Sequence, residues 1–194
     1  MIEELLSDIP DKTAHMTTTS HQFKKDVWKF CTQSDEFRSL LVVELGTHNG
    51  QTTKILSYLF DNVITVNNNE STVAKEFNKE KDNITFYNFD LYREPWQFSN
   101  GDIFFIDADH SYNAVCMDID NCLKLTSSLE KKIFIFDDYG ANQHVGKVKR
   151  AVDTYINNGT LEIVSHIGHA PPFSFDGTHG KTLAYYEGII CQEV

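Results

Sequence analysis

Residues 40–60 have the sequence LLVVELGTHNGQTTKILSYLF, which predicts a buried strand, a glycine-containing turn and a helix in succession. The strand-like part is nearly continuously apolar, as in a strand covered on both faces of a parallel sheet. Gly46 and Gly50 lie in the turn, where they allow a tight bend and a close approach of the backbone to a ligand. The helix that follows has one apolar face, formed by Ile55, Leu56, Leu59 and Phe60.

This alternation of strand and helix continues along the chain and predicts an α/β fold. Further strand-like runs, rich in β-branched and aromatic residues, occupy residues 62–67, 84–90, 102–107 and 132–138. Helical stripes precede the first strand and follow the fourth and fifth strands: Phe23, Val27, Phe30 and Cys31; Val115, Ile119, Cys122 and Leu123; Val145, Val148, Val152 and Tyr155. Strands and helices in alternation imply right-handed crossovers and a doubly wound, mostly parallel sheet.

The C-terminal part departs from this alternation. Residues 161–168 and 183–192 both have strand-like sequences, but residues 169–182 between them contain no helical stripe and are too many for a tight hairpin. We therefore expect an antiparallel last strand in a seven-stranded sheet, with residues 183–192 forming either an inner strand or the edge of a homodimer. No repeat or linker is visible, so we expect a single domain over 1–194, with a helical lead-in over 1–37 and the core over 38–192.

Composition and charge argue against several classes of function. The net charge of −11 does not favour nucleic-acid binding, which needs clustered Lys and Arg to neutralise phosphates. No apolar run approaches the roughly 20 residues of a membrane span. The first residues lack the basic and apolar regions of a signal peptide. The cysteines at 31, 116, 122 and 191 form no C-x-x-C pair, so we expect reduced thiols in a cytoplasmic protein.

The glycine turn leaves two interpretations open: a purely structural strand–helix turn, or a loop that carries a cofactor at the N-terminus of the helix. Its G-x-x-x-G spacing departs from the dinucleotide fingerprint G-x-G-x-x-G, which disfavours a nicotinamide-dependent oxidoreductase. With Glu44 included, the motif E-x-G-x-x-x-G resembles the first motif of class I S-adenosylmethionine-dependent methyltransferases, in which the turn lies under the amino-acid part of the cofactor. This resemblance spans roughly residues 38–192 and implies a Rossmann-like core.

Two later motifs narrow the resemblance. Residues 104–112, FFIDADHSY, resemble the fourth-strand motif of the cation-dependent O-methyltransferases of the catechol and caffeoyl-CoA type. Residues 133–140, IFIFDDYG, resemble the fifth-strand motif of the same enzymes and of metal-dependent sugar O-methyltransferases. The resemblance implies methyl transfer from S-adenosylmethionine to an oxygen of a small hydroxylated molecule, such as a sugar or a catechol-like diol, with neither nucleic acid nor membrane as a partner.

Four carboxylates follow the fourth and fifth strands: Asp107, Asp109, Asp137 and Asp138. They should converge, because ligands in open α/β sheets bind beyond the carboxyl ends of the strands. Convergence without Lys or Arg requires either that some are protonated or that a cation lies among them, and oxygen ligands suit Mg²⁺. By resemblance, the metal ligands are Asp107, Asp137 and Asp138. The alternative is that Asp109 caps the next helix and Asp138 begins a turn.

His110 lies three residues after Asp107 and is the candidate general base. A histidine can exchange a proton near neutral pH. By resemblance, it stands where the catechol-type enzymes have the lysine that takes the substrate proton, so Asp107 and His110 are the expected catalytic residues. The alternative is a loop histidine that is bonded to the backbone.

Cofactor contacts are assigned by position at the strand ends, and they comprise Glu44, Gly46, Thr47, His48, Gly50, Thr52, Asn67, Asn68, Asp90, Asp107 and Asp109. Asn67 lies 21 residues after Gly46, where nucleotide-binding sheets place an acidic residue against the ribose hydroxyls. An amide carbonyl can accept one such hydrogen bond but without charge, so we expect weaker cofactor binding. Alternatively, residues 67–69 form only a turn.

Two hypotheses from different classes follow. The first is a methyltransferase that acts on oxygen with a divalent cation. The second is a methyltransferase-like protein that binds a nucleotide or nothing and serves as a scaffold or regulator, because the ribose position carries an amide. The residues that select an acceptor are expected in the loop 169–182 and in residues 14–23, which either close over the site or merely lead into the first helix.

Overall fold

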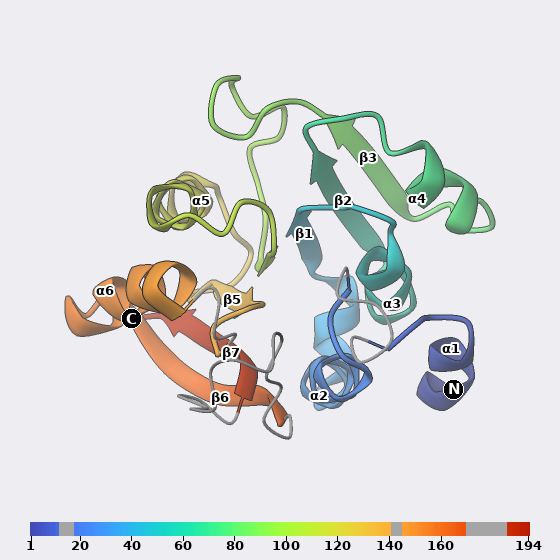
Figure 1. The fold of residues 1–194 in the computed structure, drawn as a ribbon, viewed down its shortest axis with the longest axis horizontal. Helices are drawn as coiled ribbons and strands as arrows, with labels where there is room; N and C mark the ends of the chain where they lie inside the picture. Colours follow the sequence, from blue (N-terminus) through green and yellow to red (C-terminus); the bar gives the residue numbers. More distant parts are fainter. Residues whose placement is uncertain (12–17, 141–144, 170–185) are drawn as a thin grey trace, which may run out of the picture.

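A single sheet organises the computed structural model, which describes residues 1–11, 18–140, 145–169 and 186–194 (Figure 1). Within those residues, seven strands lie in the order β3-β2-β1-β4-β5-β7-β6. Their bounds are β1 (Leu41–Leu45), β2 (Asn62–Asn67), β3 (Ile84–Asn88), β4 (Ile103–Ile106), β5 (Ile133–Phe136), β6 (Leu161–His169) and β7 (Tyr186–Glu193). The seven strands match the seven strand-like segments of the sequence.

Strand directions confirm the predicted α/β architecture. The first five strands are parallel, and β7 runs antiparallel to both β5 and β6. β7 is therefore an inner strand, as one of the two interpretations of residues 183–192 required, and β6 forms the edge. The strand order reverses between β1 and β4, and such a switch point opens a crevice at the carboxyl ends of the strands.

Helices cover both faces of the sheet because successive strand residues point to opposite sides. On one face, Val42 and Phe105 pack with apolar residues of α1, α2 and α3, while on the other Val43 and Phe104 pack with α5 and α6 (Figure 1). The helices are α1 (Ile2–Ser7), α2 (His21–Cys31), α3 (Gln51–Leu59), α4 (Thr72–Phe77), α5 (Tyr112–Lys124) and α6 (Arg150–Asn157), with a 3-10 turn at Asp35–Ser39 and a π-helical turn at Val145–Lys149. None of the helices in the described ranges is long and apolar enough to cross a bilayer.

Three features depart from the sequence pattern. The short helix α4 was not predicted, and α1 lies in the segment 1–37, for which only a helical lead-in without a stripe at α1 was expected. The stripe from Val145 to Tyr155 is divided between the π-helical turn and α6. Residues 89–102, all of which are described, form no α-helix between β3 and β4. There Phe98 packs instead against Tyr87 and Trp96, with ring centroids 5.7 Å and 5.2 Å away, so an aromatic cluster covers this end of the sheet in place of a crossover helix.

Candidate active site

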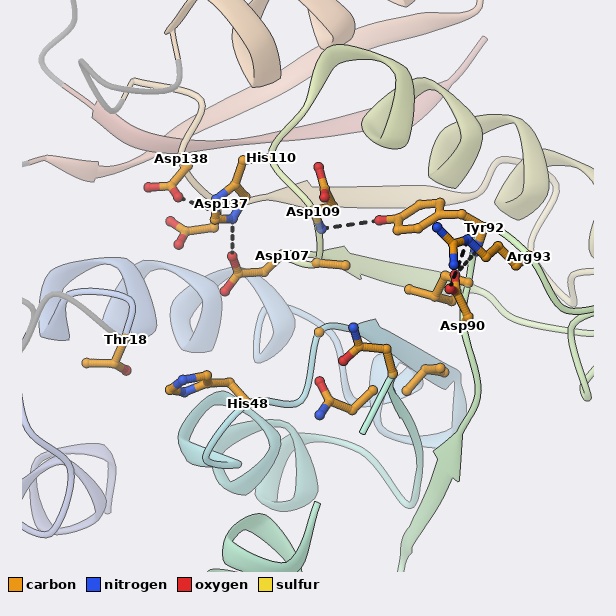
Figure 2. Close-up of a pocket in the computed structure, with 16 residues that line it drawn as sticks. Thr18, His48, Asp90, Tyr92, Arg93, Asp107, Asp109, His110, Asp137 and Asp138 are labelled. Atoms are coloured by element: carbon orange, nitrogen blue, oxygen red, sulfur yellow. Dashed lines mark hydrogen bonds and ion pairs between the residues drawn. The ribbon is translucent and has the colours of Figure 1, made fainter. Parts of the chain in front are cut away.

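A cavity of about 620 Å³ lies at the carboxyl ends of the central strands (Figure 2). Ten of the residues assigned to a site from the sequence line it: Gly46, His48, Asn67, Asn68, Asp90, Asp107, Asp109, His110, Asp137 and Asp138. Five further lining residues were not predicted, namely Val66, Leu91, Tyr92, Arg93 and Ala108, and Thr18 belongs to the segment 14–23 that was expected to contribute to acceptor selection. The volume falls in the range of ligand pockets, roughly 300–1,000 Å³.

The turn after β1 lines the cavity at Gly46, where both the backbone conformation and the close packing require glycine. Gly46 has φ 103°, and a Cβ atom there would lie 2.1 Å from the carbonyl oxygen of Asp107. The turn is further held because the Gly46 N–H donates to the Val66 carbonyl at 2.9 Å. Gly50 also has positive φ, but it packs against Asn78 and Ala74 and does not line the cavity. The turn therefore brings β1 into direct backbone contact with the end of β4.

Glu44, Thr47 and Thr52 likewise do not line the cavity. The Glu44 carboxylate is buried behind the turn, where it accepts hydrogen bonds from the hydroxyls of Thr53 at 2.5 Å and Thr65 at 2.6 Å. Thr65 in turn lies 2.7 Å from the Thr47 hydroxyl. Burial raises the pKa of Glu44 to about 8, against the lowering effect of the two hydroxyls. Glu44 thus connects β1, β2 and α3 beneath the first loop.

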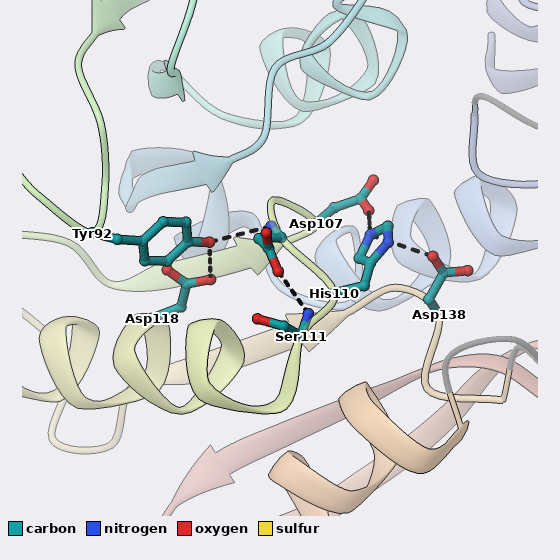
Figure 3. A network of polar contacts seen from close by, with 7 residues as sticks. Tyr92, Asp107, His110, Ser111, Asp118 and Asp138 are labelled. Atoms are coloured by element: carbon teal, nitrogen blue, oxygen red, sulfur yellow. Dashed lines mark hydrogen bonds and ion pairs between the residues drawn. The ribbon is translucent and has the colours of Figure 1, made fainter.

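His110 lies between two carboxylates at the ends of β4 and β5 (Figures 2 and 3). Its Nε2 atom is 3.1 Å from Asp107 Oδ1 and 3.4 Å from Asp138 Oδ2. Asp138 has the left-handed φ of 55°, which is uncommon outside glycine. The residues whose ligand atoms lie close together are therefore Asp107, His110 and Asp138. The expected set of metal ligands contained Asp137 in place of His110. Asp137 is buried and lines the same cavity.

The ends of β2 and β3 border the other side of the cavity. The Asn67 side-chain N–H donates to the Asn69 carbonyl at 3.2 Å, so the asparagines do form a turn while Asn67 and Asn68 line the cavity. Asp90 Oδ1 accepts from the Tyr92 backbone N–H at 2.9 Å, and its Oδ2 lies 3.7 Å from the Arg93 guanidinium. Both interpretations of Asn67 are compatible with this geometry, because the turn uses its amide nitrogen and a ribose contact would use its carbonyl oxygen.

Tyr92 is the most informative residue that sequence reasoning missed. Its hydroxyl accepts from the Asp109 N–H and donates to Asp118 of α5, each at 3.2 Å (Figure 3). Asp118 is fully buried, and burial raises its pKa to about 8. A signal was present, because Asp118 is an acidic residue within the apolar stripe of Val115, Ile119 and Cys122.

Some expected contributors to acceptor selection lie outside the described residues. These are residues 14–17 of the N-terminal segment and residues 170–182 of the long loop. Of the predicted segment 14–23, Thr18 lines the cavity, and Ser20 caps α2 by accepting from the Phe23 N–H at 3.0 Å.

Comparisons with known proteins give a family for the chain and solved structures with a similar fold. Residues 43–139 match the model of a family described as a methyltransferase domain. The structure of the tRNA methyltransferase TrmI from Aquifex aeolicus superposes with a TM-score of 0.64 at 19% identity, covering 100% of this chain and 75% of that one. The structure of an O-methyltransferase from Bacillus cereus in complex with SAH superposes with a TM-score of 0.63 at 17% identity, covering 100% of this chain and 90% of that one. The structure of the O-methyltransferase TomG from Streptomyces achromogenes in complex with SAM has a TM-score of 0.63 at 14% identity, covering 100% of this chain and 88% of that one. None of the curated proteins matches this sequence.

Replacing Glu44 by Gln should flatten the dependence of stability on pH. The raised pKa means that the folded protein keeps a proton that the unfolded chain releases between about pH 4.5 and pH 8. Stability is therefore highest below this window and falls as pH rises through it, by up to about 1.4 kcal/mol per pH unit for one group. Urea denaturation at pH 5, 6, 7 and 8 should show a shallower fall for Glu44→Gln than for the parent protein.

Asp118 titrates in the same window, so some slope should persist in the Glu44→Gln variant. The exposed Glu80→Gln serves as the matched control, because it removes a carboxylate without changing a buried site. Equal slopes for the parent and Glu44→Gln would show that Glu44 is ionised in the folded protein and would contradict the assignment.

Proposed function

This chain belongs to the S-adenosylmethionine-dependent methyltransferases, and we propose that it methylates an oxygen of a small hydroxylated molecule. The observation that carries this proposal is the meeting of Asp107, His110 and Asp138 in a cavity bordered by the Gly46 turn. A base in that arrangement would lie beside the position proposed for the methyl donor. The net charge of −11 favours a small acceptor over RNA, although some proteins of the same fold act on RNA.

The donor is proposed to lie along the strand ends, from the Gly46 turn to Asp90. Gly46 and His48 would contact its amino-acid part, Asn67 and Asn68 its ribose, and Asp90 its adenine. Bound S-adenosylmethionine supplies an electrophilic methyl group on a sulfonium. The cavity supports this placement because Gly46 has no side chain to fill it, and the apolar Val66 and Leu91 line it on the β2 and β3 side. Glu44, Thr47, Gly50 and Thr52 are proposed to support the turn without contacting the donor.

His110 is proposed to accept the proton of the acceptor hydroxyl. Its ring is held by Asp107 at 3.1 Å and faces Asp138 at 3.4 Å, which fixes its orientation in the cavity. The two carboxylates would also stabilise the imidazolium that forms when the ring takes up a proton. The remaining contribution of the chain is to hold the acceptor oxygen in line with the methyl group, which is mainly an effect of positioning.

A divalent cation, with Mg²⁺ as the first candidate, is the second group proposed for this site. Its fit rests on donor chemistry, because carboxylate oxygens of Asp107 and Asp138 lie within 4.8 Å of each other, in a group that also includes His110. Asp137 lines the same cavity and adds a further carboxylate. We propose that the three aspartates hold the cation, which leaves His110 as the base. A bound cation would lower the pKa of an acceptor hydroxyl and would suit a diol, as in a sugar or a catechol.

A calorimetric titration with S-adenosylmethionine tests the donor site. We expect a dissociation constant on the order of micromolar. NAD should give no heat under the same conditions, because the glycine turn lacks the dinucleotide spacing. Absence of heat with both S-adenosylmethionine and S-adenosylhomocysteine would reject the donor site and favour the scaffold or regulatory alternative.

Replacing His110 by Gln should lower methyl transfer by roughly 10²- to 10⁴-fold while S-adenosylmethionine affinity stays unchanged, because the ring acts on the acceptor proton and not on the donor. Transfer of labelled methyl to a panel of catechols and free sugars measures the first quantity, and calorimetry measures the second. His166→Gln is the matched control, since His166 lies on the edge strand β6 and does not line the cavity. Undiminished transfer by His110→Gln would exclude a base at this position.

Asn67→Asp should tighten S-adenosylmethionine binding, by about fivefold, because a carboxylate accepts a stronger hydrogen bond from a ribose hydroxyl than an amide carbonyl does. Asn69→Asp adds the same charge to the same turn but does not line the cavity, so it separates the ribose contact from a general electrostatic effect. Unchanged or weaker affinity of Asn67→Asp, or an equal effect of Asn69→Asp, would count against a ribose at this position.

A further inference from the structure

Tyr92 joins three elements that are separate in the sequence. It follows β3, and its hydroxyl bonds to the Asp109 N–H after β4 and to the Asp118 carboxyl on α5 (Figure 3). We propose that Tyr92 and Asp118 form a positioning pair that holds the loop from Asp107 to His110 in its catalytic arrangement. The effect of the pair on catalysis rests on the function proposed above for this cavity.

The Tyr92 hydroxyl donates one hydrogen bond and accepts another, each to a defined partner. A tyrosine hydroxyl has one hydrogen to donate and lone pairs that accept. Burial raises the pKa of Tyr92, so the hydroxyl stays protonated and able to donate. Because its hydrogen goes to Asp118 Oδ2, its lone pairs face the Asp109 N–H. Without the acceptor on α5, that hydrogen would be free to turn toward Asp109 and oppose the bond.

The Asp109 backbone is the point through which this pair acts on the site. Asp109 Oδ1 accepts from the Ser111 N–H at 2.7 Å, and the Ser111 hydroxyl caps α5 by accepting from the Ala114 N–H at 3.3 Å. These bonds lie within the loop and its helix, whereas the Tyr92 bond fixes the loop to the segment that follows β3, which is separated from β4 in the sheet by β2 and β1. Asp107 and His110 flank the anchored residue, so a shift of Asp109 would move both of them.

The burial of Asp118 argues for a role beyond packing. It occupies an inward position of α5, where an apolar side chain would pack without desolvating a polar group. Among the described residues its Oδ1 atom has no hydrogen-bond partner, so the bond from Tyr92 offsets only part of the desolvation. Leu has the branching of Asp without its oxygens. Asp118→Leu is therefore expected to fold at least as stably as the parent protein while it removes the acceptor for Tyr92.

The test measures hydrogen exchange of the Asp109 amide and steady-state kinetics in four variants. Tyr92→Phe and Asp118→Leu should each lose Asp109 protection and lower kcat, on the order of tenfold for a hydrogen bond that aligns reacting groups. Asp118→Asn keeps an acceptor oxygen and should restore both quantities. The double variant Tyr92→Phe/Asp118→Leu should lose no more Asp109 protection or kcat than either single variant, because the two residues act through one hydrogen-bond network.

Tyr155→Phe is the matched control, because Tyr155 donates to Asp120 on the outer part of α5 at 2.7 Å and does not line the cavity. Full Asp109 protection in Tyr92→Phe, or lost protection with unchanged kcat, would overturn the proposal. If the parent protein bound no S-adenosylmethionine, the proposed donor site would fail, and the exchange measurement would still decide whether the pair holds Asp109.

Discussion

The backbone contact between the turn after β1 and the end of β4 determines where a ligand can lie. At Gly46 even one added carbon would collide with the carbonyl of Asp107, at 2.1 Å. The contact is possible because β1 and β4 are parallel neighbours whose carboxyl ends meet at the switch point of the sheet. Glu44 supports the turn from behind through two threonine hydroxyls. The Gly46 turn and the Asp107–His110 loop therefore form adjoining walls of one cavity.

Carboxyl groups serve different purposes at the two ends of the sheet. At the amino end of β4, burial would raise the pKa of Asp102, but hydrogen bonds from the Leu41 N–H and from Ser127 and Ser128 lower it overall. That carboxylate joins the start of β1 to the loop that follows α5. At the carboxyl end, Asp107 and Asp138 instead meet around His110 in a cavity. Glu44 and Asp118 are buried behind this cavity with pKa values raised to about 8. The acidic composition thus includes both structural carboxylates and a cluster with His110 that lines the cavity.

Much of the fold could be predicted because it depends on local patterns. The apolar runs identified the first five strands, residues 161–168 and 183–192 were also recognised as strand-like, and the stripes identified α2, α3 and α5. The prediction was weaker where tertiary contacts replace local periodicity. Residues 89–102 cross from β3 to β4 without an α-helix, because Phe98 and Trp96 pack as an aromatic cluster. The short helices α1 and α4 carry too few residues to show a stripe.

The sequence by itself determined the sheet, its glycine turn and the strand ends at which polar residues gather. Ten assigned residues line one cavity for that reason, since parallel strands bring their carboxyl ends to the same edge. Only the tertiary structure decided which side chains touch. His110 meets Asp107 of its own loop and also Asp138, which has a left-handed backbone after β5. Tyr92 meets Asp118 across 26 residues of sequence. Such contacts depend on side-chain direction and on the packing of separate elements, which spacing along the chain does not record.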